Sequence, residues 1–491
     1  MKCLTTFAFL ISSVLLTNAT KTPSIVIIGA GTSGLSAGKK LLENGIQNIT
    51  ILEAESRIGG RINSVYFGEN YVDLGATNCH GEKGNIVYET VKDLNLLGDT
   101  QYPKDFYYSS GVKVDSKFSE ELIKIMTSIY PNMVEPAKNM SLGDYVIKYY
   151  NKAINEKFGS DKEKLNIAKG AIYFLETVAL SDENSPSWFD ITIDNDFIPN
   201  EGNTWLNWKG KGYKTFLEVF LNNSGVHEKV IFNKEVKKVS YDASKKWQGV
   251  TVSCSDNTQY VADHVIVTTS LGVLKENLNN LFEPELPSVK RKAIDRMGFG
   301  VIMTVALHYE NPWWENDSKG FNFIWSKEDL ENSVSEFSEG PHYNNRSWIT
   351  YICGFVKADL NPNVLIAWFS GNLVPEIELI SDETLSDGLT YLNKKFLGHA
   401  YNVTKPDKII HSKWRANPHF RGSYSFQKPE AEKRDNPTNA EEDLAVPIKN
   451  VDGRPFVHFA GEATHAYYFS TVQGATESGL REAGIIKKYY S

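Results

Sequence analysis

Three features of residues 24–61 predict an α/β fold built on a parallel sheet. An apolar run, Ile25–Ile28, is typical of a short strand buried on both faces, and a helix is expected to begin near Ser33. A second apolar run, Ile49–Leu52, ends in the acid Glu53. The turn between strand and helix carries three glycines in G-x-G-x-x-G spacing: Gly29, Gly31 and Gly34. Strand, glycine turn, helix, strand and acid in this order predict a dinucleotide-binding unit.

Each of the three glycines has its own physical role. The first permits the tight turn, the second lets backbone approach a pyrophosphate, and the third lets the helix pack closely on the strand. The phosphates then meet the helix N-terminus, whose N–H groups attract anions. Glu53, 19 residues after Gly34, is placed to accept hydrogen bonds from ribose hydroxyls. An ordinary glycine-rich turn, the alternative, does not account for this acid.

The residues after Glu53 indicate which dinucleotide binds. They include two arginines and two adjacent glycines: Arg57, Gly59, Gly60 and Arg61. This composition suits a second pass of backbone and guanidinium groups over a diphosphate, which nicotinamide enzymes do not usually need. Here the sequence resembles the glutathione-reductase-like FAD enzymes, specifically the flavin amine oxidases. The resemblance implies FAD as the cofactor; a nicotinamide dehydrogenase, the alternative, would lack flavin absorbance.

Size, charge and cysteine content limit the other possibilities. A chain of 491 residues exceeds one comfortable core, so we expect two domains. The net charge of −8 argues against a nucleic-acid partner and favours a cationic small molecule, although a merely soluble acidic protein can have the same charge. Outside the first segment three cysteines remain, which allow at most one disulfide and show no metal-ligand spacing.

The first residues are typical of a secretory signal. Met1–Ala19 has a lysine at position 2, an apolar core over Leu4–Leu16, and small residues before the expected cleavage site. No later apolar run is long enough to cross a bilayer. Six Asn-x-Ser/Thr sites follow, at Asn48, Asn139, Asn222, Asn316, Asn345 and Asn402. We therefore expect a secreted, glycosylated protein without a transmembrane span.

A second motif block follows the dinucleotide unit. Residues 72–88 resemble the "GATW-hydrophobic-HG…GN" segment of animal and fungal polyamine oxidases. His80 matches the histidine that projects over the flavin toward the amine, and its pKa near ambient pH can keep that amine neutral. Asn78 replaces the family's tryptophan in the substrate tunnel. The block implies three further FAD contacts, from Gly75, Ala76 and Thr77.

The middle of the chain shows a helical pattern between Glu89 and Asn200. Amphipathic runs at 120–129, 142–158 and 164–180 support it, and the resemblance places a helical part of the substrate domain here. Four aromatic residues either line a substrate funnel or, as we favour, belong to the core: Phe106, Tyr107, Trp188 and Phe189.

The chain then returns to the cofactor domain. A helix is expected over Thr215–Leu221, and Val230–Ser240 with Gly249–Cys254 predict a small antiparallel layer. The resemblance places Val236 where backbone contacts adenine. The apolar run Asp263–Thr269 resembles the family's "VIVTVPLGVLK" and predicts another buried strand, in which His264 is structural rather than catalytic.

The largest departure from the family follows. Met297–Leu307, with Trp313 and Trp314 after it, resembles the motif "GxGxxxKIFLxF-x-x-PFW". The family's lysine holds a water against flavin N5 and assists reoxidation by oxygen, but this chain has Thr304 at that position. The replacement implies slowed reaction with oxygen, a different electron acceptor, or an inactive FAD protein. Beyond it we expect strands at 321–325, 348–356 and 364–369, and a surface loop over 326–347.

The last two blocks return to cofactor chemistry. Residues 414–425 resemble "W…P…GSYS", in which Tyr424 matches one wall of the aromatic cage that steers the amine toward N5. Ser423 stands where monoamine oxidases carry a flavin-linked cysteine, so FAD is expected to be noncovalent. Residues 457–465 resemble "FAGEATH", and the final helix would point its N-terminus at the flavin. These blocks imply four more FAD contacts: Gly461, Glu462, Thr471 and Val472.

Together the blocks predict an α/β protein with two interleaved domains. One is an FAD-binding Rossmann-like domain of the glutathione-reductase type, and the other is an α+β substrate-binding domain. The predicted cofactor domain comprises 22–88, 201–295 and 405–491. The predicted substrate domain comprises 89–200 and 296–404.

The resemblance also implies a reaction. A secreted FAD-dependent polyamine oxidase would oxidise spermine, spermidine or acetylated forms by passing a hydride from the carbon next to nitrogen to the flavin. Water would split the resulting imine into an aldehyde and a shorter amine, and O2 would take the electrons to give hydrogen peroxide. Because of Thr304, two alternative functions are retained: an amine dehydrogenase that uses another electron acceptor, and a catalytically impaired amine-binding flavoprotein. The sequence does not define the amine or the oligomeric state.

Overall fold

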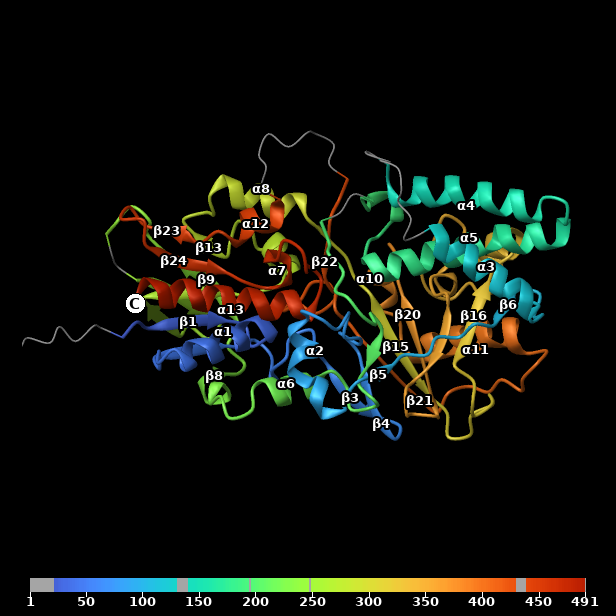
Figure 1. The fold of residues 1–491 in the computed structure, drawn as a ribbon, viewed down its shortest axis with the longest axis horizontal. Helices are drawn as coiled ribbons and strands as arrows, with labels where there is room; N and C mark the ends of the chain where they lie inside the picture. Colours follow the sequence, from blue (N-terminus) through green and yellow to red (C-terminus); the bar gives the residue numbers. More distant parts are fainter. Residues whose placement is uncertain (1–21, 130–139, 194–195, 247–248, 430–438, 491) are drawn as a thin grey trace, which may run out of the picture.

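Two six-stranded sheets form the centres of two units in the computed structural model (Figure 1). The structure describes residues 22–129, 140–193, 196–246, 249–429 and 439–490. The predicted signal Met1–Ala19 and the glycosylation site at Asn139 lie outside these residues.

The first sheet is centred on β1 (Ile25–Ile28) and has the order β23-β24-β12-β1-β2-β8. β1 pairs in parallel with both of its neighbours. Its alternate residues serve two different apolar cores, because Ile27 packs on one face of the sheet and Val26 on the other. The remaining strands are β2 (Ile49–Leu52), β8 (Val230–Ile231), β12 (His264–Val267), β23 (Ile448–Lys449) and β24 (Pro455–Phe459).

The first and last helices of the chain pack against each other on this sheet (Figure 1). α1 (Thr32–Glu43) follows the glycine turn, and α13 (Val472–Tyr489) ends the described chain. A Cβ atom on Gly479 would lie 2.1 Å from the carbonyl oxygen of Ser33, so only glycine permits this close approach. The close packing brings the two ends of the sequence to the same side of the sheet.

The second sheet has the order β21-β15-β20-β19-β16-β6 and is antiparallel except for the β16–β6 pair. Its strands are β6 (Phe106–Tyr108), β15 (Met303–His308), β16 (Gly320–Ile324), β19 (Gly354–Lys357), β20 (Val364–Phe369) and β21 (Lys408–His411). Four long helices belong to this unit: α3 (Ser116–Ile129), α4 (Leu142–Phe158), α5 (Lys162–Glu183) and α11 (Asp382–Leu397). The predicted helical runs are thus confirmed as α3, α4 and α5.

The predicted antiparallel layer is present beside the first sheet as β11-β10-β9, and β13 adds to it in parallel with β9. The strand predicted over Val230–Ser240 is divided, because Val230–Ile231 pairs with β2 in the first sheet. A short helix, α6 (Lys214–Phe220), precedes the layer in the chain. Its strands are β9 (Val236–Ser240), β10 (Val250–Cys254), β11 (Gln259–Ala262) and β13 (Phe282–Glu283).

Two local predictions in the second unit are wrong. The expected loop over 326–347 contains α9 (Lys327–Glu336), which Ser326 caps by accepting a hydrogen bond from the N–H of Asp329 at 3.0 Å. The strand expected over 348–356 begins only at Gly354, because Trp348–Thr350 form a 3-10 turn.

Three of the four aromatic residues that could line a funnel lie in the core instead. Phe106, Tyr107 and Trp188 are buried, in agreement with the core interpretation, whereas Phe189 is 48% exposed.

One predicted domain boundary differs in the structure. β21 pairs with β15 and so belongs to the second sheet. The boundary placed before residue 405 is therefore corrected to a position after His411.

Candidate active site

The glycine turn after β1 has the geometry that an anion site requires. Gly29 adopts φ +104° and donates its N–H to Leu52 O at 2.8 Å. A Cβ atom on Gly34 would lie 2.0 Å from Gly29 O, so the helix can pack here only with glycine. The N-cap of α1 is Gly31, which offers no side chain to the first N–H groups of the helix. These N–H groups are available to a phosphate.

Glu53 lies at the end of β2, beside this turn. Its Oε2 accepts a hydrogen bond from the N–H of Ala30 at 2.7 Å, and its Oε1 accepts one from the N–H of Glu55 at 2.8 Å. Burial raises the pKa of Glu53, while the two backbone hydrogen bonds oppose the rise. The side chain is thereby fixed at the edge of the turn, where its remaining lone pairs can accept ribose hydroxyls.

The second glycine turn lies directly against the first. Gly59 donates its N–H to Ala30 O at 2.9 Å and forms a bridge with Gly31. Arg57 folds back onto this turn and donates to the carbonyl of Gly60 at 2.7 Å. Arg57 therefore shapes the turn as well as placing positive charge beside it.

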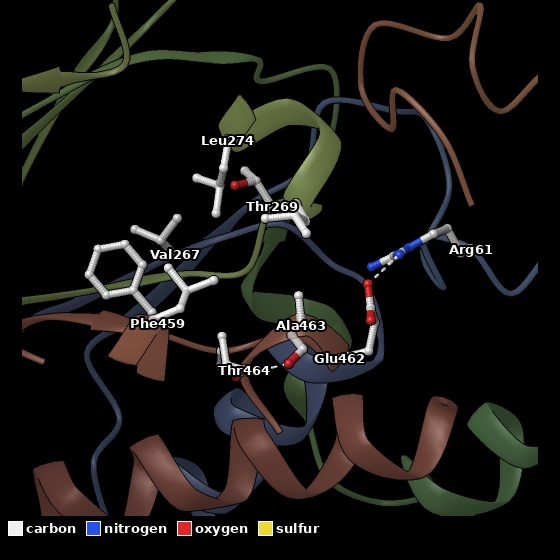
Figure 2. A pocket seen from close by; sticks show the side chains of 12 residues that line it. Arg61, Val267, Thr269, Leu274, Phe459, Glu462, Ala463 and Thr464 are labelled. Carbon is white, nitrogen blue, oxygen red and sulfur yellow. Dashed lines mark hydrogen bonds and ion pairs between the residues drawn. The ribbon is translucent and has the colours of Figure 1, made fainter. Parts of the chain in front are cut away.

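Arg61 joins this turn to the C-terminal part of the chain. Its Nη1 donates to Ser423 O at 2.6 Å and to Glu462 Oε1 at 2.8 Å, an ion pair visible in Figure 2. The other oxygen of Glu462 accepts from Ser425 Oγ at 2.6 Å and from the N–H of Ser470 at 2.9 Å. One buried carboxylate thus connects three segments that are distant in sequence: the turn at Arg61, the segment at Ser425, and its own segment with Ser470.

A pocket lies at this junction, lined by residues of the second turn, of β12 and of the loop after β24 (Figure 2). The buried hydroxyl of Thr269 in its wall has no hydrogen-bond partner among the described residues. Gly461 adopts φ +129°, and a Cβ atom there would meet only open space. The unpaired hydroxyl of Thr269, the uncovered backbone at Gly461 and the two glycine turns are features that suit FAD binding.

The 75–77 segment packs on the same junction. A Cβ atom on Gly75 would lie 1.9 Å from Arg61 O, and Ala76 donates its N–H to that oxygen at 3.2 Å. The hydroxyl of Thr77 accepts from the Asn78 side chain at 3.4 Å. The predicted cofactor residues 75–77 are therefore beside Arg61.

His80 has a defined protonation state. Its Nδ1 lies 2.9 Å from Thr204 O, and because a carbonyl only accepts, Nδ1 carries the hydrogen and Nε2 keeps its lone pair. Burial lowers the pKa of His80, so the ring is neutral at pH 7. The ring packs edge-to-face on Trp205 at 5.6 Å, and Trp205 does the same with Tyr102 at 5.6 Å. His80 keeps accessible surface, so Nε2 can accept a proton or a hydrogen bond from an amine.

Tyr424 is fixed at both ends by the end of α5. Its hydroxyl donates to Ser181 O at 2.8 Å, and its carbonyl accepts from the side chain of Asn184 at 2.5 Å. Burial, with nearby carboxylates, raises the pKa of Tyr424, so its hydroxyl stays protonated. The ring is half-buried, as a wall of a binding site would be.

Two acids between these contacts were missed by sequence reasoning. The side-chain carboxylates of Asp182 and Glu183 form no hydrogen bond or ion pair with any residue in the described part of the chain. Burial raises the pKa of each to about 7, and Asp182 is pushed further by the charge of Glu183. Asp182 also raises the pKa of Tyr102 and Cys353, which places these groups together. Asp182 is nevertheless exposed at the surface and Glu183 is half-buried, so both carboxylates can be reached from solvent.

Thr304 lies in β15 with 3% of its surface exposed. Its N–H donates to Ser412 Oγ at 2.9 Å, and Trp368 is its cross-strand neighbour on β20. Thr304 brings no charge to this position.

The three remaining predicted residues lie at the ends of elements. Thr471 is the N-cap of α13, where its hydroxyl accepts from the N–H of Gly474 at 2.9 Å, and Val472 opens that helix. Val236 opens β9, shortly after Lys234 donates its N–H to Glu53 O at 2.8 Å. Val236 is therefore near the predicted ribose end, and the contacts of all three with FAD remain predictions.

The fold and the site define a class of protein: a two-domain FAD-dependent oxidoreductase whose cofactor is bound by converging glycine turns. The chain belongs to the family described as flavin containing amine oxidoreductase, whose sequence pattern matches residues 32–487. The predicted family, fold class and FAD cofactor are thereby confirmed.

Individual relatives agree with this assignment. The human peroxisomal N(1)-acetyl-spermine/spermidine oxidase is 27% identical over 94% of each chain. A probable polyamine oxidase of Arabidopsis thaliana is 28% identical over 96% of this chain and 99% of its own length. Among solved structures, cyclohexylamine oxidase from Brevibacterium oxydans IH-35A shares the fold with a TM-score of 0.64, at 17% identity over 95% of this chain and 99% of that chain.

Two further properties hold within the described residues. No helix there has the length and apolar character needed to cross a membrane. Nor do their histidines, cysteines and acids form a cluster of three or more that could hold a metal ion.

Proposed function

We propose that the protein is a polyamine oxidase acting on spermine, spermidine or their acetylated forms. The observation that carries the proposal is the pair of partnerless carboxylates, Asp182 and Glu183, beside Tyr424. A cation that lies against these carboxylates would favour their charged forms, whose pKa is otherwise raised to about 7. A polyamine supplies a second positive nitrogen for this purpose, and relatives named for acetylated polyamines and polyamines support the choice.

The side chains of the site prepare the amine. Nε2 of His80 accepts a proton from the substrate nitrogen, which leaves the lone pair that oxidation requires. Tyr424 limits the orientation of the substrate next to it. FAD, when bound beside this site, would supply the acceptor for the hydride on the carbon next to that nitrogen. Water then splits the imine to an aldehyde and a shorter amine.

O2 is the proposed electron acceptor, with hydrogen peroxide as product. Thr304 favours a second candidate, because this buried residue offers no positive charge where oxygen is reduced. In that candidate the protein transfers electrons to another acceptor, or binds amines without oxidising them.

We also propose that the protein is secreted and glycosylated. The signal-like Met1–Ala19 supports secretion. The asparagines of the five acceptor sites within the described residues are all exposed, as glycosylation requires: Asn48, Asn222, Asn316, Asn345 and Asn402.

Anaerobic titration tests the proposed function. Purified, FAD-loaded protein is mixed without oxygen with spermine, spermidine, N1-acetylspermine and, as a matched monoamine, butylamine. Bleaching of the flavin absorbance by the polyamines, and weaker bleaching by butylamine, is expected. An unchanged spectrum with every polyamine would establish the non-catalytic candidate. Admission of air to bleached protein then tests oxygen, since slow recovery would favour another acceptor.

A further inference from the structure

A chain of side-chain hydrogen bonds runs through the buried face between the first sheet and α13. His458 on β24 lies 3.0 Å from Glu482 Oε2 through Nδ1 and 3.2 Å from His264 Nδ1 through Nε2. His264 on β12 lies 2.9 Å from the hydroxyl of Tyr490 through its own Nε2. Both histidines and Glu482 are fully buried. None of these groups belongs to the amine site.

When both histidines are neutral, the donors and acceptors of these hydrogen bonds can be assigned in only one way. A carboxylate only accepts, so His458 Nδ1 donates to Glu482, and Nε2 of His458 must accept from His264 Nδ1. Nε2 of His264 then accepts from Tyr490, whose oxygen accepts from Arg454. From the Tyr490 hydroxyl to Nδ1–H of His458, each hydrogen in this arrangement has an acceptor.

At its Glu482 end, this series of hydrogen bonds reaches the loop at Gly461 and Glu462. Glu482 shares its other oxygen with Arg481, whose Nε donates to Oε1 at 2.7 Å. Arg481 in turn donates to Thr464 O at 2.8 Å and to Phe459 O at 2.9 Å. These two carbonyls flank Gly461 and Glu462, the loop that lines the pocket at Arg61. The buried histidines are thus connected to the loop through Glu482 and Arg481.

Other charged groups lie near the two ends of this hydrogen-bond network. Lys290 on α8 (Ser288–Arg296) interacts with Glu482, Arg481 and Asp443 of α12 (Ala440–Ala445), and Asp263 before β12 interacts with Tyr490. Lys290 is itself buried over the ring of Phe459, and burial lowers its pKa to about 7. The negative charges of these acids are balanced by the positive charges of the arginines. Little net negative charge therefore remains to favour protonation of the histidines.

The closed network of hydrogen bonds leaves no good position for an additional proton on His264. Its Nδ1–H already donates to His458 Nε2 across 3.2 Å, and a hydrogen on its Nε2 would meet the Tyr490 hydroxyl hydrogen that is donated to this nitrogen. Arg454 adds repulsion, and burial with this charge lowers the pKa of His264 to about 2. His264 therefore stays unprotonated while β24 and α13 remain in contact, and it would accept a proton if these two elements separated.

We propose that the His264–His458 pair is an acid-sensitive latch on FAD: protonation separates α13 from β24 and releases the loop at Gly461 that Arg481 holds. Acid thus promotes loss of the cofactor without any change in the amine site.

FAD retention against pH tests the latch. The loaded protein is equilibrated between pH 7.5 and pH 5, and released FAD is measured by its fluorescence. One excluded proton predicts that the apparent Kd for FAD rises by about tenfold for each pH unit below about 6.5. His264→Gln, which keeps a donor and an acceptor but does not titrate, is expected to reduce this rise to less than about threefold per unit. His411→Gln is the control, since His411 also pairs with an acid, Asp382, but lies in the second sheet.

The outcomes are separable from those of the proposed function, because no amine or turnover is involved. A wild-type pH slope that persists in His264→Gln would overturn the latch, as would a flat slope in the wild-type protein. If His264→Gln does not fold, hydrogen exchange of the wild-type protein decides. After correction for intrinsic rates, the segment from Gly461 to Gly479 should exchange at least about tenfold faster at pH 5 than at pH 7.5. Equal corrected rates would also overturn it.

Discussion

Neutralising the acid pair at the end of α5 should affect substrate binding and stability in opposite directions. Asp182→Asn and Glu183→Gln keep the side-chain size but remove the charge. Because burial raises each carboxyl pKa to about 7, the charged forms are unfavourable in the free protein. After a discount for solvent screening, each substitution is expected to stabilise the free protein by about 1 kcal/mol at pH 8. For a chain of this size this corresponds to a rise in Tm of about 1–2 °C.

The same substitutions should weaken polyamine binding. A charge-assisted contact between a carboxylate and an ammonium contributes about 1.5–3 kcal/mol, so KM for spermine should rise by about 10–100-fold. KM for butylamine, which has no second nitrogen, should change by less than about threefold. In the wild-type protein KM for spermine should fall as pH rises through about 7, because the carboxyls then become charged. This pH dependence should be weaker in each variant.

The assay is steady-state peroxide release combined with thermal unfolding of each variant. Glu163→Gln is the matched control, because Glu163 is an exposed acid at the opposite end of the same helix. It should change neither KM nor Tm. The reasoning is refuted if Asp182→Asn lowers Tm without changing KM, since the acids would then have a structural role.

Four other predictions concern the cofactor, oxygen and stability. Glu53→Gln should weaken FAD binding by about tenfold in fluorescence titration, as the ribose end loses a charged acceptor; an unchanged Kd would contradict its role. Glu462→Gln should destabilise the protein by about 3 kcal/mol in urea unfolding, because Arg61 loses its buried partner; a loss below about 1 kcal/mol would contradict this. Thr304→Lys should speed reoxidation by about tenfold or more in stopped flow, and no change would refute our account of this position. The free energy of unfolding of the wild-type protein minus that of His264→Gln should fall as pH drops below about 6.5, by up to about 1.4 kcal/mol per unit, because the unfolded chain protonates His264 while folded His264, with a pKa of about 2, stays neutral; a difference that does not change with pH would contradict this.

The parts of the fold that could be predicted are those with local causes. β1, the glycine turn and α1 occupy adjacent residues, and each is determined by apolar pattern, by backbone freedom or by phosphate chemistry. The helix over 327–336 also had a local signal, since Ser326 and Asp329 have the spacing of a cap. Its weak apolar pattern hid it among polar residues.

The parts that could not be predicted depend on contacts between distant residues. Asp182 lies in the last turn of α5, and nothing near it in sequence indicates that Tyr424 is beside it. His458 and His264 are likewise separated by 194 residues and meet only because β24 pairs with β12.

The sequence by itself determined the cofactor class, because phosphate and ribose recognition uses short, local spacings around Gly29 and Glu53. Only the tertiary structure decided which acids lie beside Tyr424 and which histidines contact each other. A pKa and a binding contact depend on all neighbouring atoms in space, and most of those atoms come from distant segments of the chain.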